Sequence, residues 1–126
     1  VKIETAFVNL IKELSENNEV ILLYPIPEIG VNLQKKKFEN MVRVFNYTYS
    51  DFLKQNMEVI DFFNTIDIPN VHKVYPHKVF CNEQKNICST HNKDNFYFFD
   101  GYHPSLEGAR MINNMIIKKI NSLEKN

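Results

Sequence analysis

One stretch of the chain reads Val20-Ile21-Leu22-Leu23-Tyr24-Pro25, five apolar residues followed by a proline. An apolar run without polar alternation is typical of a strand that is covered on both faces, as strands in parallel sheets are. Pro25 lacks a backbone N–H and restricts the residue before it, so the strand should end there. The stretch therefore predicts a buried strand over residues 20–24 and, with it, a parallel sheet.

The segments around this strand predict helices alternating with a second strand. Apolar residues recur at three- and four-residue steps over 3–16, after Asp51 and after Ser105, and we expect Asp51 and Ser105 to be the N-caps of their helices. Residues 71–75 predict a second, short strand, which Pro76 closes. The order helix, strand, helix, strand, helix predicts an α/β fold with parallel strands, in which the sheet looks incomplete.

The remaining segments are less regular. Residues 28–37 predict a polar loop that contains the lysine run 35–37, for which a solvated surface is the default interpretation. The apolar residues between 38 and 45 suggest one or two helical turns. Residues 77–95 have no apolar period and predict an ordered loop that something other than a core holds, whereas residues 96–99 predict an extended aromatic segment packed in the core.

Length and composition exclude several classes of protein. A chain of 126 residues is one domain, and 15 basic against 15 acidic residues give no net charge that would favour nucleic acid. A hydrophobic content of 44% can form a core, and no apolar run approaches the roughly 20 residues that cross a bilayer. The chain begins at Val1 without a methionine or a leader, and from this we expect a processed or trimmed part of a longer protein.

Two cysteines, Cys81 and Cys88, have six residues between them. We favour a disulfide, which would stabilise the fold by about 2 to 3 kcal/mol and place the domain outside the cytosol. Two reduced thiols are one alternative. A zinc site formed with His77 and His91 is another, although structural zinc sites favour closer cysteine pairs.

The chemistry-bearing stretch reads Asp100-Gly101-Tyr102-His103-Pro104-Ser105, just ahead of the last helix. An aspartate three residues before a histidine, in a turn with glycine and proline, can reach Nδ1 of the imidazole. Such a carboxylate fixes the tautomer, leaves Nε2 free to accept a proton, and stabilises the imidazolium. The alternative is an Asx-type turn beside a surface histidine. Tyr24 and Tyr102 are candidates for bordering a sugar ring, with core or rim packing as their alternative.

These residues resemble the last conserved block of the SGNH (GDSL-like) hydrolases, which is Asp-x-x-His followed by Pro and then Gly; Asp100, His103, Pro104 and Gly108 match it. The order of a proline segment, Cys81, Cys88 and an aromatic residue before Asp100 is similar to the SGNH domains fused to membrane acyltransferase-3 domains, and this likeness spans nearly the whole chain. The resemblance implies a three-layer α/β/α (flavodoxin-like) SGNH-hydrolase fold.

The family's Gly-Asp-Ser nucleophile block and the oxyanion-hole blocks are missing here. We therefore expect residues 1–126 to be a single domain, the C-terminal part of an SGNH-type domain, which is inactive alone. Ser105 is better explained as a helix cap than as a nucleophile.

In the intact domain, the resemblance implies a serine esterase or O-acyltransferase that acts on acyl groups, in particular acetyl groups, of a bacterial cell-envelope polysaccharide. Asp100 and His103 would be catalytic, with no cofactor and no metal. The partners implied are the polysaccharide and a covalently linked membrane acyltransferase domain, and the location is periplasmic or extracytoplasmic. A non-catalytic module that binds glycan or another partner on the same scaffold is the alternative function.

Overall fold

The structure, a computed structural model, describes residues 2–33, 35 and 46–124. The helical turns predicted within residues 38–45 lie outside the described residues, as do two of the three lysines of the run. The elements follow one another in this order: α1 (Lys2–Ser15), β1 (Val20–Leu23), α3 (Tyr49–Asn64), β2 (Val71–Val74), the 3-10 helix η2 (Pro76–Val79), β3 (Cys81–Asn82), β4 (Ile87–Cys88) and α4 (Leu106–Glu124).

The strands β1 and β2 pair in parallel, with Val20 opposite Val71 and Leu23 opposite Val74. The predicted α/β class and the parallel sheet are therefore confirmed. Each strand ends one residue earlier than predicted, although the amide of Tyr24 still donates to the carbonyl of Val74 at 2.9 Å. Coverage of β1 is incomplete, because Leu22 is buried while the side chain of its neighbour Leu23 is exposed.

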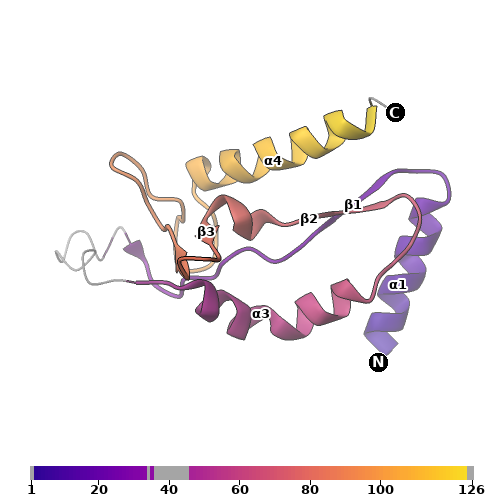
Figure 1. The fold of residues 1–126 in the computed structure, drawn as a ribbon, viewed down its shortest axis with the longest axis horizontal. Helices are drawn as coiled ribbons and strands as arrows, with labels where there is room; N and C mark the ends of the chain where they lie inside the picture. Colours follow the sequence, from indigo (N-terminus) through magenta and orange to yellow (C-terminus); the bar gives the residue numbers. More distant parts are fainter. Residues whose placement is uncertain (1, 34, 36–45, 125–126) are drawn as a thin grey trace.

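Figure 1 shows α3 and α4 on opposite sides of the two strands, with α1 at the end of the molecule where the loop between α1 and β1 turns. Two clusters of buried side chains hold these elements together. One surrounds Phe52 and Phe98 and reaches Ile112 of α4. The other joins Leu22 and Tyr24 of the first strand segment to Ile66, and Phe7 of α1 packs against it.

The apolar stripe of α1 is only partly buried, which corrects the prediction of one inward face. Ile11 is buried, and the ring of Phe7 stacks on Phe63 with centroids 5.6 Å apart. Leu10, Leu14 and, most of all, Ile3 are exposed to solvent. In α4 the stripe is likewise incomplete: Ile112 is buried, whereas Leu106 in the first turn is 92% exposed. Periodicity identified these helices but overestimated how much of each face is covered.

The N-cap of α3 is Thr48, and the prediction of Asp51 was wrong. The amide of Asp51 donates to Oγ1 of Thr48 at 3.0 Å, and the amide of Thr48 donates to Oδ2 of Asp51 at 2.9 Å. This reciprocal pair is a capping box, in which the acidic residue occupies the third helical position. The helix therefore begins at Tyr49, two residues before the predicted cap.

Residues 77–95 are more structured than a loop. They include most of η2 and the antiparallel pair β3 and β4, in which Cys81 lies opposite Cys88. Phe80 and Cys88 belong to the core cluster around Phe52, so the prediction that a core does not hold this segment was wrong. In residues 96–99, Phe98 is buried as expected, but the ring of Phe99 is 63% exposed.

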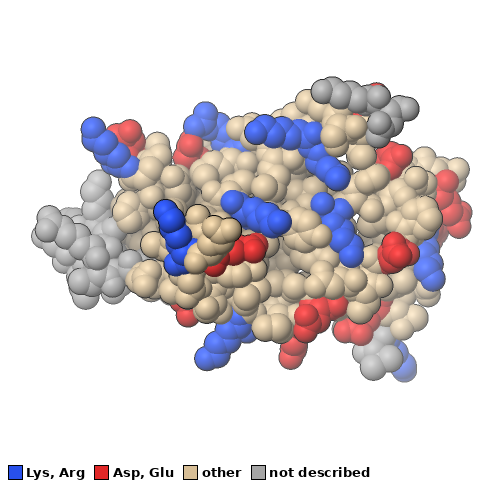
Figure 2. Space-filling view, viewed as in Figure 1, with Lys and Arg blue, Asp and Glu red and all other residues tan. Residues whose placement is uncertain are grey.

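Acidic side chains gather over α1 and the neighbouring part of α3 in Figure 2, while basic side chains are spread over the rest of this face. No helix among the described residues is long and apolar enough to cross a membrane.

Candidate functional site

Asp100 and His103 meet in the turn before α4. Nδ1 of His103 lies 2.9 Å from Oδ2 and 3.1 Å from Oδ1 of Asp100. Oδ1 of Asp100 also accepts the backbone N–H groups of Tyr102 at 2.7 Å and of His103 at 2.8 Å. The backbone of the turn thus holds the carboxylate in place beside the ring. This explains why a spacing of three residues is enough to bring Asp100 and His103 into contact.

The backbone of this turn is held by close contacts with other segments. The amide of Gly30 donates to the carbonyl of Gly101 at 2.9 Å, and the amide of Phe99 donates to the carbonyl of His103 at 2.8 Å. A Cβ atom on Gly101 would lie 2.8 Å from the backbone of Gly30 and Val31. Glycine is therefore required between Asp100 and His103 by the approach of the segment that follows β1.

Ser105 caps the helix that follows the turn, as predicted. Its Oγ accepts the amide of Gly108 at 3.1 Å and donates to the carbonyl of Phe96 at 2.6 Å. Its carbonyl accepts the amide of Ala109 at 2.8 Å. Gly108 lets this helix start approach the extended segment, because a Cβ there would lie 2.0 Å from the carbonyl oxygen of Tyr97.

The electrostatics of the pair favour an ionised carboxylate. The backbone N–H of Tyr102, followed by the ring of His103, holds the pKa of Asp100 below its ordinary value of 3.8. The side chain of His103 is 74% exposed. Within the described part of the chain, Nε2 of His103 has no hydrogen-bond partner, so this nitrogen faces solvent and is available to another group.

Such an arrangement can act as an oriented base. A carboxylate that accepts Nδ1–H leaves the Nε2 lone pair free, and it stabilises the ring when Nε2 takes up a proton. Among the residues that the structure describes, no serine hydroxyl hydrogen-bonds to His103. Ser15, Ser50, Ser105 and Ser122 direct their hydroxyls to other partners. The described residues therefore place an imidazole, oriented by a carboxylate, at the start of α4, with no serine hydroxyl bonded to it.

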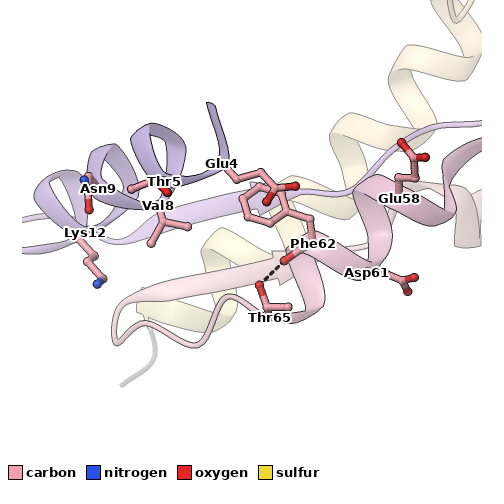
Figure 3. Close-up of a pocket in the computed structure, with 9 residues that line it drawn as sticks. All are labelled: Glu4, Thr5, Val8, Asn9, Lys12, Glu58, Asp61, Phe62 and Thr65. Atoms are coloured by element: carbon pink, nitrogen blue, oxygen red, sulfur yellow. Dashed lines mark hydrogen bonds between the residues drawn. The ribbon is translucent and has the colours of Figure 1, made fainter. Parts of the chain in front are cut away.

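Two cavities lined by described residues lie away from this pair. An open cavity of about 730 Å³ lies between parts of α1 and α3 and is lined by Glu4, Lys12, Asp61 and neighbouring residues (Figure 3). A smaller one of about 190 Å³ lies beside the ends of β1 and β2 and is lined by Tyr24, Tyr75 and His77, among others. Neither Asp100 nor His103 lines either of them.

Cys81 and Cys88 form a disulfide. This excludes the zinc site considered from the sequence, because both sulfur atoms are bonded to each other and cannot bind a metal ion together with His77 and His91. No group of three or more metal-ligating side chains occurs in the described ranges of the chain. His72, expected to be packed or solvated, contacts Oε2 of Glu19 through Nε2 at 2.5 Å. Of the two tyrosines considered as sugar contacts, Tyr24 is buried and Tyr102 is exposed.

Sequence reasoning missed the residues that support the pair from a distance. Gly30 has a φ of 72° and brings the segment after β1 against Gly101. The glycine itself is the only local signal for this backbone conformation. His77 was considered only as a metal ligand. It is buried and stacks on Phe52 with ring centroids 4.6 Å apart. No local sequence pattern predicted that contact.

The fold and the site together define a mixed α/β domain with an aspartate–histidine pair at the start of its last helix. The chain belongs to the family of SGNH domains fused to AT3 domains, whose family model matches residues 2–118. No curated protein and no solved structure matches the chain. Membership of the SGNH family associates the domain with hydrolase and acyltransferase chemistry.

Proposed function

We propose that the domain is the part of a serine O-acyltransferase or esterase that carries the base. The observation that supports this most directly is the 2.9 Å contact between Nδ1 of His103 and Asp100, combined with an Nε2 that faces solvent. An imidazole oriented in this way is the general base of triad enzymes. The alternative of a simple Asx-type turn accounts for the bonds from Asp100 to the backbone, but it gives no reason for the ring to be held as well.

We further propose that residues 1–126 are the C-terminal part of a three-layer SGNH-type domain and that the nucleophilic serine belongs to an upstream segment of the parent protein. Two features support this. The described serines are engaged elsewhere or lie in no nucleophile motif, and the described residues form one parallel pair of strands where an α/β/α layer usually has several. Alone, the chain is expected to be inactive.

The reaction divides into two steps. The serine Oγ attacks the acyl carbonyl while Nε2 of His103 takes the hydroxyl proton, and Asp100 stabilises the imidazolium. The tetrahedral intermediate collapses, the C–O bond to the leaving alcohol breaks, and His103 returns the proton to that oxygen. A sugar hydroxyl or water then attacks the acyl-enzyme while Nε2 of His103 takes its proton, the bond between the acyl carbon and the serine Oγ breaks, and His103 returns the proton to that Oγ. Capture by the sugar gives transfer, and capture by water gives hydrolysis.

The proposed substrate is an acyl group, in the first instance acetyl, on a bacterial cell-envelope polysaccharide. The proposed location is periplasmic or otherwise extracytoplasmic, tethered through a membrane acyltransferase domain. The family match to AT3-fused domains supports the tether. The disulfide supports an oxidising compartment, because such bonds persist outside the cytosol. This chemistry needs only side chains and no bound cofactor.

Turnover by the longer protein that contains the serine tests this proposal. We expect His103→Ala to abolish release or transfer of acetyl from an acetylated glycan, while the unfolding midpoint changes little because the ring is exposed. Asp100→Asn should lower kcat by up to about four orders of magnitude, since the tautomer is no longer fixed. His91→Ala, an exposed histidine outside the turn, is the matched control. Activity of His103→Ala within a few-fold of wild type would instead favour a non-catalytic glycan-binding module.

A further inference from the structure

A second place in the molecule has the composition of a small-ligand site. The cavity of about 190 Å³ lies where β1 and β2 end: Tyr24 follows the first strand, and Tyr75, His77 and Lys78 follow the second. The complete lining, called the tyrosine cavity below, is Tyr24, Tyr49, Leu53, Ile60, Asn64, Tyr75, His77, Lys78 and Glu83. Ligands of open α/β sheets bind beyond the carboxyl ends of the strands, which is the position of this cavity.

Aromatic rings form much of the wall. The rings of Tyr24 and Tyr75 are 4.6 Å apart between centroids, and Tyr49 stacks on His77 at 5.7 Å. His77 in turn stacks on the fully buried Phe52. A wall supported by the core keeps its shape when empty, so little ordering is needed when a ligand binds. Flat aromatic faces suit the C–H faces of a pyranose ring.

The polar groups of the cavity are mixed and neutral in sum. Lys78 contributes one positive charge and Glu83 one negative charge, while burial lowers the pKa of His77 and favours its neutral ring. Burial, followed by the neighbouring Tyr75, raises the pKa of Tyr24 to about 12, so this phenol stays protonated. The Tyr24 hydroxyl donates to Oδ1 of Asn64 at 2.8 Å. The cavity therefore contains both donors and acceptors without an excess of either charge.

The same groups argue against a charged ligand. Nζ of Lys78 lies 5.0 Å from the centroid of the Tyr75 ring and so already occupies the cation position over that face. An anion at Lys78 would also meet the carboxylate of Glu83. A volume of about 190 Å³ is below the roughly 300–1,000 Å³ of drug-sized sites and limits the occupant to about one ring.

We propose that the tyrosine cavity binds one neutral sugar ring, at a site separate from Asp100 and His103. That the sugar belongs to the acylated polysaccharide rests on the function proposed above, whereas binding in the cavity does not depend on catalysis. The cavity would then hold one residue of the glycan while another is presented to the exposed imidazole, and it would select the glycan by ring shape and hydroxyl pattern.

Amide NMR of the 126-residue chain, prepared with its disulfide, tests the proposal. The probes are methyl α-glucopyranoside, methyl β-galactopyranoside and N-acetylglucosamine at millimolar concentrations, with tetramethylammonium and inorganic phosphate as the charged comparison. At least one sugar should give saturable shifts confined to the cavity segments, from the end of β1, α3 and residues 75–83. The two charged probes should bind there more weakly or not at all.

Variants decide whether the cavity groups make the contacts. Glu83→Gln and Lys78→Met should each raise the sugar Kd about tenfold, which is the loss of a hydrogen bond to a charged group. Nε2 of His77 lies 3.4 Å from Oε1 of Glu83 in the cavity. Glu19→Gln removes a carboxylate that contacts a different histidine, His72, and Lys85→Met removes a lysine between β3 and β4; neither residue lines the cavity, so both variants should bind as wild type does. Tyr49→Phe removes only a hydroxyl from the cavity lining and should also weaken sugar binding. It replaces either charge variant that disturbs folding.

Several results would overturn the proposal: no saturable shift with any sugar, stronger binding of a charged probe, shifts confined to residues 99–106, or equal weakening by the control variants. The two proposals fail independently. If the chain binds sugar and the His103→Ala variant of the longer protein stays active, only the catalytic proposal is wrong. Loss of turnover in His103→Ala without any sugar binding in the chain would sink the cavity proposal alone.

Discussion

At the scale of single residues, Gly108 and Gly30 are each required for a different reason. A Cβ on Gly108 would lie 2.0 Å from the carbonyl oxygen of Tyr97, so the start of α4 and the extended segment would have to separate. Gly30 has open space around the same position, but its φ of 72° is unfavourable for other residues. Packing constrains the first glycine, and backbone conformation constrains the second.

We expect Gly108→Ala to lower the free energy of unfolding by about 3 kcal/mol, because overpacking against a backbone atom outweighs the roughly 1 kcal/mol that alanine gains in a helix. Gly30→Ala should cost only about 1 kcal/mol, the typical penalty of a left-handed conformation. Urea unfolding of the two variants measures the difference. Equal losses, or a stable Gly108→Ala, would show that α4 does not approach Tyr97 this closely.

The titration of Asp100 is the second prediction at this scale. Its pKa lies below 3.8, chiefly because of the amide of Tyr102 and then because of His103. A carboxyl group whose pKa is lowered in the folded state stabilises that state above its ordinary pKa, and the stabilisation is lost as the pH falls through the lowered value. Carbon-13 NMR of the carboxyl group should show the low pKa, and His103→Ala should raise it only partway. A normal pKa in the wild-type chain would contradict the turn geometry.

The aspartate–histidine contact is the part of the site that sequence could predict. Three residues in one turn bring the groups together through local geometry alone, and the cap at Ser105 follows from local hydrogen bonding. The support from Gly30 and the stacking of His77 on Phe52 could not be predicted, because each depends on segments that meet only after the chain has folded.

At the scale of the element, the start of α3 shows why a helix boundary is harder to predict than the helix. Thr48 and Asp51 are both good capping residues, and a single sequence does not say which is the cap and which the third residue of a capping box. The periodic apolar residues identified α1, α3 and α4 to within a few residues. They did not reveal that much of α1 is left exposed, because an apolar stripe is buried only where another part of the molecule covers it.

Removing the cap tests the assignment of Thr48. Thr48→Ala should lower the free energy of unfolding by about 1 kcal/mol, because the amide of Asp51 loses its acceptor. Thr48→Ser, which keeps the hydroxyl, should restore most of that stability in the same denaturant titration. If Thr48→Ala is neutral while a change of Asp51 to alanine alone is costly, the helix begins at Asp51 after all.

At the scale of the whole molecule, the order of elements gave the α/β class, while the pairing of strands explains where the functional groups gather. The parallel strands β1 and β2 end on the same side of the sheet. The segment after β1 contains Gly30, and the segments after both strands contribute residues to the tyrosine cavity. The disulfide ties the β3–β4 hairpin, which carries Glu83, close to that cavity. One sheet end thus supports both the proposed base and the proposed sugar site.

Exposed apolar side chains remain on this framework, at Ile3, Leu10 and Leu14 of α1 and at Leu106 of α4. Sequence patterns predicted all four as inward-facing. The patterns report only that a face is suited to burial, and the described residues provide no surface that covers these positions. The sequence was thus a better guide to which elements form than to how completely they pack.

The central claim is that Asp100 holds the ring of His103 with Nε2 free to take a proton, and the tautomer of that ring tests it most directly. Long-range hydrogen–nitrogen NMR, at a pH where the ring is neutral, distinguishes a protonated Nδ1 from a protonated Nε2. We predict Nδ1–H in the wild-type chain and loss of that preference in Asp100→Ala. A wild-type ring protonated on Nε2, unchanged by Asp100→Ala, would contradict the account.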